Sequence, residues 1–255
     1  GRRLLYHAHI DTVPAGNVTE WSMKPFAAEI VNGRLYGRGA GDDKGSVAAQ
    51  IMALVALKRS EVHLEKGVIR VATVSDEESG GMEGTKWLRD IGKLAPDLLV
   101  VGEQTNNQVA IGERVACGID LIVYGKSTHG AMPWVGDNAV VKMAGVIQWL
   151  KEKLIDKFPE SIHPYLPSPT LNIGRITGGV QWNIVPGQCK IEMDRRLLPS
   201  ETREKAMEEI RALLDEFNEN VAPLEYEIYT SGEVASNINT PPGDPFVQIA
   251  NQTLA

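Results

Sequence analysis

Cysteine, basic charge and long apolar stretches are all scarce in this sequence. Its 255 residues include two cysteines, Cys117 and Cys189, which is too few for a disulfide framework and typical of a reduced compartment such as the cytoplasm. Lys and Arg number 26 against 33 Asp and Glu. No nucleic-acid partner is therefore expected, because that affinity depends on cations that neutralise phosphates. No apolar run approaches the roughly 20 residues of a membrane-spanning helix, so no membrane partner is expected either.

The composition that remains is that of an ordinary globular protein. Hydrophobic residues make up 43% and charged residues 23% of the chain, and the length suits one large or two modest domains. The chain starts without a methionine, and a strand pattern is already present at Leu4. Its last residues, up to Ala255, follow a helical pattern with no stop signal. We therefore expect that both ends have been cut from something longer.

The first part of the chain, to about residue 110, alternates strand and helix patterns. Short apolar runs, typical of buried and largely parallel strands, occupy Leu4–Tyr6, Val68–Val74 and Leu98–Val101. Apolar residues at helical spacing predict helices over Ser46–Lys58 and Met82–Ile91. This alternation predicts an α/β domain with a mostly parallel central sheet.

From about Glu113 the pattern changes to strands combined with two long helices. The predicted strands of this part are Ile119–Tyr124, Thr170–Ile176, Cys189–Asp194 and Glu225–Tyr229. The predicted helices are Asn138–Phe158 and Ser200–Asn220. This set predicts a compact α+β open-faced sandwich. A loop over Asn237–Asp244 leads to a helix from Phe246 that we assign back to the first domain. The sequence thus predicts an inserted domain, residues 113–235, within a domain made of 1–112 and 236–255.

Polar side chains follow each strand of the first domain. His9 and Asp11 end the first strand, and because residues i and i+2 share a face of an extended chain, Asp11 can orient the His9 imidazole toward a metal. Glu77 and Glu78 follow the second strand and Glu103 follows the third, at the edge where open α/β sheets bind ligands. Taken singly, each pattern also fits an ordinary explanation, such as a chance His-x-Asp pair or a solvated acidic turn.

A glycine-rich segment, Gly37–Gly45, contains Asp42 and leads into the helix at Ser46. Glycines before a helix can bind phosphate, but two adjacent aspartates would repel an anion and favour a cation. Together with the strand-end groups they gather negative charge that a bound cation would neutralise. Imidazole and carboxylate ligands without cysteine fit a catalytic zinc site, with cobalt or manganese as substitutes. Adjacent glutamates can divide the work, one binding metal and one acting as a general base.

The histidines other than His9 carry weaker signals. His129 lies in a loop between a strand and the helix at Asn138, where a surface role is the commoner one. His7 and His9 lie two residues apart and are rivals for one face of the strand. The choice of His9 rests on a family resemblance.

Ordered motifs along nearly the whole chain resemble those of the dinuclear zinc amidohydrolase and metallopeptidase family. This family contains acetylornithine deacetylase, succinyl-diaminopimelate desuccinylase, aminoacylase and carboxypeptidase G. The segments that carry the resemblance are His9–Pro14, Gly37–Gly45, Asp76–Gly80, Gly102–Glu103, Gly125–Pro133, Asn138–Ala139, Gly178–Gly179, Asn183–Pro186 and Asp194–Arg196. Each motif is moderately specific, and the ordered set is highly specific.

The resemblance implies two zinc ions held by four residues of this chain. His9 and Glu103 would bind one ion, Glu78 would bind the other, and Asp42 would bridge both. The family's fifth ligand is a histidine that no residue after Phe246 supplies. We therefore expect the first ion to be bound well and the second, which has only Asp42 and Glu78, to be bound weakly.

The resemblance also implies catalytic and substrate-binding roles. Glu77 would be the general base and proton shuttle, and Asp11 would orient His9. The inserted domain resembles the family's dimerisation lid, so a homodimer is expected. His129 of the lid would reach the partner subunit's active site and stabilise the oxyanion. Asn183 and Arg196 match positions that bind the substrate, and an Arg suits a bidentate grip on a carboxylate.

The function that follows is hydrolysis of an amide bond in an N-acyl amino acid by a metal-activated water. It would be of the deacetylase or desuccinylase type found in amino-acid biosynthesis, with no signal that selects the acyl group. A dipeptidase or carboxypeptidase of the same family is the nearest alternative, since both act on small amide substrates. A truncated, non-catalytic metal-binding relative is an alternative of another class, against which the intact Glu77 and His129 argue.

Overall fold

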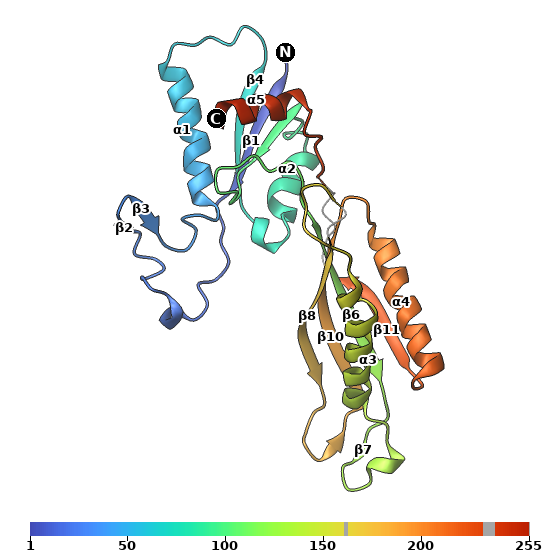
Figure 1. The fold of residues 1–255 in the computed structure, drawn as a ribbon. Helices are drawn as coiled ribbons and strands as arrows, with labels where there is room; N and C mark the ends of the chain where they lie inside the picture. The colour runs from blue at the N-terminus through green and yellow to red at the C-terminus, as the bar shows by residue number, and fades with distance from the viewer. Residues whose placement is uncertain (161–162, 232–237, 255) are drawn as a thin grey trace. The chain divides into compact units, whose positions relative to one another are not determined.

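The computed structural model describes residues 1–160, 163–231 and 238–254, and Figure 1 shows the fold. The chain divides into two compact units. Unit 1 comprises residues 1–109 with the segment from 248 on, and unit 2 comprises residues 110–247. The chain thus passes from unit 1 to unit 2 at 109–110, where the sequence predicted 112–113. It returns to unit 1 at 247–248, whereas the sequence predicted 235–236, a position that lies outside the described residues. No helix in the described ranges is long and apolar enough to cross a membrane.

Unit 1 is built on a small parallel sheet. Its strands are β1 (Arg3–His9), β4 (Val68–Val74) and β5 (Leu98–Val101), and they lie in the order β4-β1-β5 with both pairings parallel. Helix α1 (Lys44–Arg59) packs against β1 and β4. The three strands are the apolar runs in the sequence, and the predicted parallel sheet is confirmed. Because β1 is central, its carboxyl end lies between those of β4 and β5.

Several short elements complete unit 1. They are a 3-10 turn at Val18–Glu20, the hairpin of β2 (Glu29–Val31) and β3 (Arg34–Tyr36), a 3-10 turn at Glu77–Ser79, a π-helical turn at Met82–Lys86, α2 (Trp87–Asp90) and most of α5 (Pro245–Leu254). One helix was predicted over Met82–Ile91, and the structure instead has the π-helical turn followed by α2. The turn is closely packed, since a Cβ atom at Gly84 would lie 1.9 Å from the Ser75 carbonyl oxygen.

Unit 2 is a four-stranded antiparallel sheet covered on one face by two helices (Figure 1). The strand order is β11-β6-β10-β8. The bounds of these elements are β6 Val115–Tyr124, β8 Thr170–Gly178, β10 Gln188–Leu197, β11 Glu225–Ser231, α3 Ala139–Lys153 and α4 Arg203–Asn220. Alternate residues of β10 are buried, which is the pattern of a sheet with one face against a core. The predicted open-faced sandwich is confirmed.

Helix α3 begins at a capping residue but ends earlier than its sequence predicts. The Asn138 side chain caps α3 by accepting the N–H groups of Val140 and Val141, as short polar residues do at helix starts. Helix α3 ends at Lys153, earlier than the predicted Phe158, because Leu154 leaves the helical conformation and a 3-10 turn follows. A second small antiparallel pair, β7 (Thr128–His129) with β9 (Ile184–Val185), holds the loops that precede α3 and β10.

Candidate metal centre and active site

The carboxyl ends of the three parallel strands bring polar side chains to one edge of the unit 1 sheet. His9 is the last residue of β1 and is 2% exposed. Glu77 and Glu78 lie in the 3-10 turn after β4, and Glu103 lies just beyond β5. Asp42 lies in the loop that enters α1. Because β1 is the central strand, the other groups surround His9, at the edge where such sheets bind ligands.

His9 is the centre of this cluster. Its Nε2 atom lies 3.0 Å from Oδ1 of Asp42, 3.9 Å from Oε2 of Glu77 and 4.0 Å from Oε1 of Glu103. One ligand atom each of His9, Asp42 and Glu103 lie within 4.8 Å of one another. One imidazole and two carboxylates form a donor set that suits zinc, cobalt or manganese. These residues therefore fit the predicted metal ion.

Asp11 lies against the Nδ1 side of the His9 ring. The Nδ1 atom of His9 lies 3.3 Å from Oδ1 of Asp11 and 3.2 Å from its carbonyl oxygen. A proton on Nδ1 is favoured by these two oxygens, which leaves the Nε2 lone pair free to face the carboxylate cluster. Burial would raise the pKa of Asp11, but backbone N–H donors, chiefly that of Glu78, lower it overall. The carboxylate of Asp11 is therefore ionised beside the imidazole, and the Nδ1 hydrogen bond itself goes to the Asp11 carbonyl oxygen.

Glu78 lies apart from the three-residue group but is joined to it through Asp11. Its backbone N–H donates to Oδ2 of Asp11 at 3.1 Å, and its own Oε1 accepts the N–H of Val13 at 3.1 Å. Three of the four predicted ligands thus converge around one point, and the fourth is held on the adjoining turn.

Asp43 is a buried residue of the site that the sequence did not single out. Its side chain has no exposed surface, and its Oδ2 accepts the backbone N–H of His9 at 3.1 Å. It is joined to Asp42 by a cis peptide bond. The doubled aspartate in the glycine-rich segment was the available signal, and it was interpreted only as a sign of cation binding. The structure gives the two side chains different places, with Asp42 in the cluster and Asp43 beneath the end of β1.

The carboxylates of the cluster raise one another's proton affinity. Burial raises the pKa of Glu103 to about 7, and the charges of Asp43, Asp42 and Glu77 add to this effect. Burial also raises the pKa of Glu77. Burial would lower the pKa of His9, but the surrounding carboxylates, led by Glu77 and Asp43, raise it overall. These pKa values are raised because several negative charges lie close together at a partly buried site. A divalent cation would relieve the same repulsion.

Three residues of unit 2 were predicted to take part in the site, and two of them, His129 and Asn183, lie close together. His129 pairs with Ile184 between β7 and β9, and the N–H of Gly130 donates to the carbonyl of Asn183 at 2.7 Å. The Nδ1 atom of His129 accepts the N–H of Ala131 at 3.1 Å. The neutral ring therefore carries its proton on Nε2, which is the atom that can donate to a ligand.

Arg196 lies elsewhere in unit 2. It is near the far end of β10, eight residues beyond Gln188, which spans about 26 Å at the usual rise of a strand. The β7–β9 pair that carries His129 adjoins the other end, where Gly125 donates to the carbonyl of Gly187. The Nε atom of Arg196 donates to Oδ2 of Asp194 at 2.9 Å, and within the described ranges its two terminal nitrogens have no hydrogen-bond partner. One chain therefore does not bring Arg196 together with His129 and Asn183.

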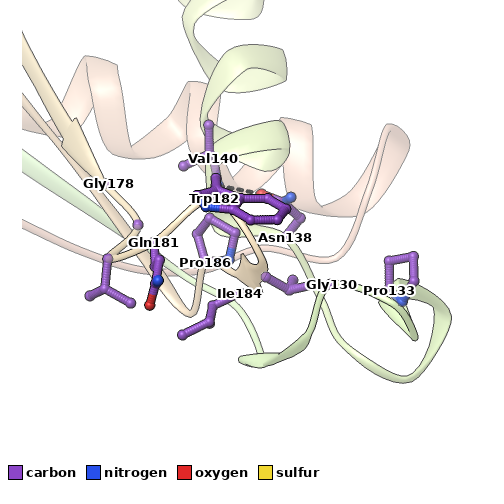
Figure 2. Close-up of a pocket in the computed structure, with 12 residues that line it drawn as sticks. Gly130, Pro133, Asn138, Val140, Gly178, Gln181, Trp182, Ile184 and Pro186 are labelled. Carbon is purple, nitrogen blue, oxygen red and sulfur yellow. Dashed lines mark hydrogen bonds between the residues drawn. The ribbon is translucent and has the colours of Figure 1, made fainter.

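A cavity of about 670 Å³ lies beside the His129 loop in unit 2. Figure 2 shows Gly130, Asn138 and Ile184 among its lining residues, with Trp182 and Gln181 from the loop that follows β8. Trp182 is 93% exposed. The lining is mostly backbone and apolar side chains, and it includes none of the metal-site residues of unit 1.

Comparison with known proteins gives one family. The model of the peptidase family M20/M25/M40 matches residues 5–252. Curated relatives include a succinyl-diaminopimelate desuccinylase of Wolbachia pipientis wMel, 32% identical over 203 residues, covering 76% of this chain and 50% of that protein. Another, of Rhodospirillum centenum, is 31% identical over 254 residues, covering 95% of this chain and 62% of the relative. The chain thus spans about half to three fifths of the length of these relatives.

A solved structure gives the same fold. The M20 family metallo-carboxypeptidase of Sulfolobus solfataricus superimposes with a TM-score of 0.74 at 21% identity, covering 99% of this chain and 70% of the other. The match extends over both units of the chain.

Proposed function

Since this chain belongs to the peptidase family M20/M25/M40, we propose that it hydrolyses the amide bond of an N-acyl amino acid with the help of a divalent metal ion. The observation that carries the proposal is the convergence of His9, Asp42 and Glu103, with Glu77 beside them. Relatives named succinyl-diaminopimelate desuccinylase support a deacylase acting on a small substrate.

His9, Asp42 and Glu103 would hold the ion, and zinc is the metal we propose, with cobalt or manganese as substitutes. A second ion would use Asp42 and Glu78. When bound, the metal would polarise the substrate carbonyl and make a neighbouring water more acidic. Asp11 holds the His9 ring so that Nε2 faces the ligand position.

Glu77 is the proposed general base. Its carboxylate is 44% exposed and lies 3.9 Å from Nε2 of His9, so it faces the ligand position without being one of the three grouped ligands. Burial raises its pKa, which increases its affinity for a proton taken from water. The same carboxyl group would then give this proton to the departing amine.

His129, Asn183 and Arg196 are proposed to bind the substrate from unit 2. His129 presents a protonated Nε2, which suits donation to the developing oxyanion. Asn183 offers an amide beside it, and Arg196 offers its terminal nitrogens to a carboxylate. The separation of Arg196 from His129 along β10 supports a site that two chains build together, and hence a homodimer through unit 2. The edge strand β8, with Ile176 52% exposed, is available for such pairing.

A substrate screen tests the proposal. The purified protein is assayed with added zinc or cobalt against acetyl- and succinyl-amino acids and against dipeptides, with and without a chelator. Chelator-sensitive release of an acyl group supports the deacylase, whereas cleavage of dipeptides alone indicates a peptidase of the family. Hydrolysis that survives the chelator would exclude the metal-dependent reaction. Metal binding without hydrolysis of any of these substrates would indicate a non-catalytic relative.

A further inference from the structure

His7 lies on the same strand as His9, two residues earlier, yet its ring has a different contact. Its Nε2 atom lies 2.8 Å from the Oγ1 atom of Thr85, a residue 78 positions away in the chain. Thr85 belongs to the π-helical turn Met82–Lys86, which follows the turn that carries Glu77 and Glu78. The His7 ring therefore joins the central strand to the segment that supplies the proposed base.

The backbone of His7 makes two further connections. Its carbonyl oxygen accepts the N–H of Gly102 at 2.7 Å and the Nε2 group of Gln50 at 3.0 Å. Gly102 immediately precedes Glu103, and Gln50 is a buried residue of α1, the helix that the Asp42 loop enters. A Cβ atom at Gly102 would lie 2.5 Å from the Cβ of Ser46. The chain just after β5 is therefore in close contact with the start of α1.

We propose that His7 is a positioning residue, which through Thr85, Gly102 and Gln50 sets the spacing of the segments that carry Asp42, Glu77, Glu78 and Glu103. His7 contacts a residue in or next to each of the three segments that must converge on His9, and it is not one of the three grouped ligands. The inference rests on the proposed metal centre, but it does not depend on which amide the protein cleaves.

A substitution at Thr85 can remove the His7–Thr85 contact without altering a ligand. Thr85→Val removes the hydroxyl and keeps the branched shape, whereas Thr85→Ser keeps the hydroxyl. Zinc affinity is measured by competition with a chromophoric chelator, and the visible spectrum of bound cobalt reports the ligand geometry. We expect Thr85→Val to bind zinc about tenfold more weakly, the lower end of what residues behind a metal site contribute, and to change the cobalt spectrum. Thr85→Ser should match the unaltered protein in both measurements.

Asp97→Asn is the matched control for general loss of stability. Asp97 accepts three hydrogen bonds from Arg3 at the amino end of the same sheet, far along β1 from His7. This variant should unfold at a lower temperature but bind zinc as the unaltered protein does. Should Thr85→Val fail to fold, Thr85→Ala removes the same hydroxyl.

Three outcomes overturn the inference. They are unchanged zinc affinity in Thr85→Val, an equal loss in Thr85→Ser, and an equal loss in Asp97→Asn. Failure of the unaltered protein to bind zinc is a different result, since it would overturn the proposed metal centre itself.

Discussion

Glu77 differs from Asp42 and Glu103 in that it is not one of the three grouped ligands around His9. Its side chain is 44% exposed, within the range of Asp42 at 37% and Glu103 at 48%, so it can meet water and a departing amine. Burial of its inner part raises its pKa, and the charges of Glu78, Asp11 and Asp42 contribute in the same direction. An accessible carboxylate with raised proton affinity is what general-base catalysis near neutral pH requires.

Glu77→Gln should separate catalysis from metal binding. Glutamine keeps the size of the side chain but does not accept a proton, so kcat should fall by about 10² to 10⁴. Zinc affinity should change little, because Glu77 is not among the three grouped ligands. Glu83→Gln, in the next turn, is the matched control and should leave kcat unchanged. A Glu77→Gln enzyme with nearly full activity would show that another group is the base.

The sequence identified most polar groups at the strand ends, but not how each side chain is used. His7 and His9 share a face of one strand, so periodicity could not choose between them. The structure separates them by partner, with His9 at the carboxylates and His7 at Thr85. The position of the Asp43 side chain could not be predicted from the sequence either. Whether an aspartate faces the site or the end of a neighbouring strand depends on the path of the loop. Partners 34 or 78 residues away, such as these, leave no local signal.

At the scale of elements, several side-chain hydrogen bonds join helix α4 to strand β11, and one of them is made by Tyr226. The hydroxyl of Tyr226 donates to Oδ1 of Asp215 at 2.8 Å. Burial, together with this hydrogen bond and the charge of Asp215, raises the pKa of Tyr226 to about 12. An unfolded tyrosine has a pKa of about 10. The Tyr226–Asp215 hydrogen bond therefore makes the packing of α4 on β11 depend on pH.

Tyr226→Phe should reveal that dependence. Below pH 10 the phenol is protonated in both states, and loss of the hydrogen bond should cost about 1 kcal/mol. From pH 10 to 12 the unfolded phenol ionises first, so the native protein loses this contribution as pH rises through the raised pKa of Tyr226. Denaturant unfolding of the unaltered protein and of Tyr226→Phe, at pH 8 and at pH 11, measures the difference in their free energies of unfolding, which should be smaller at pH 11. A difference in free energy of unfolding that is the same at both pH values would contradict the raised pKa of Tyr226.

The elements that the sequence predicted best are those with a long one-sided apolar pattern. The stripe of Met207, Ile210, Leu214 and Phe217 predicted α4, and all four side chains are buried. The segment after β4 was predicted less well, because part of it is a π-helical turn, in which Gly84 lies too close to Ser75 for a Cβ atom. Ser75 lies outside the turn, so the helical spacing of apolar residues does not report this contact. Local pattern determines which elements form, and packing determines how they bend and end.

At the scale of the whole molecule, buried apolar side chains are concentrated in unit 2. Its core cluster extends from Val115 to Ile228. In unit 1, the apolar side chains that are buried among the described residues are Leu5, Ala8 and Val74. Strand residues such as Leu99 and Val101 are 46% and 44% exposed, although parallel sheets are usually covered on both faces. Unit 1 should therefore be the less stable of the two, with a larger share of its stability supplied by a bound metal.

Zinc should consequently stabilise one unit and not the other. The cluster of His9, Asp42 and Glu103 lies wholly in unit 1. An ion at one hundred times its Kd adds about 2.7 kcal/mol to the state that binds it. In calorimetry we expect zinc to raise the lower unfolding transition and to leave the upper one in place, and a chelator should reverse the shift. His9→Ala should abolish the shift while leaving the upper transition unchanged.

The number of ions follows from the same set of ligands. The first position has three converging side chains, whereas the second has only Asp42 and Glu78 among the residues that the structure describes, and Glu78 already accepts the N–H of Val13. A carboxylate pair binds zinc more weakly than a site with an imidazole and two carboxylates, because fewer donors replace the ion's water. After dialysis, metal analysis by mass spectrometry should therefore find about one zinc per chain. Two tightly held ions per chain would contradict this, and would require a further ligand for the Asp42–Glu78 position.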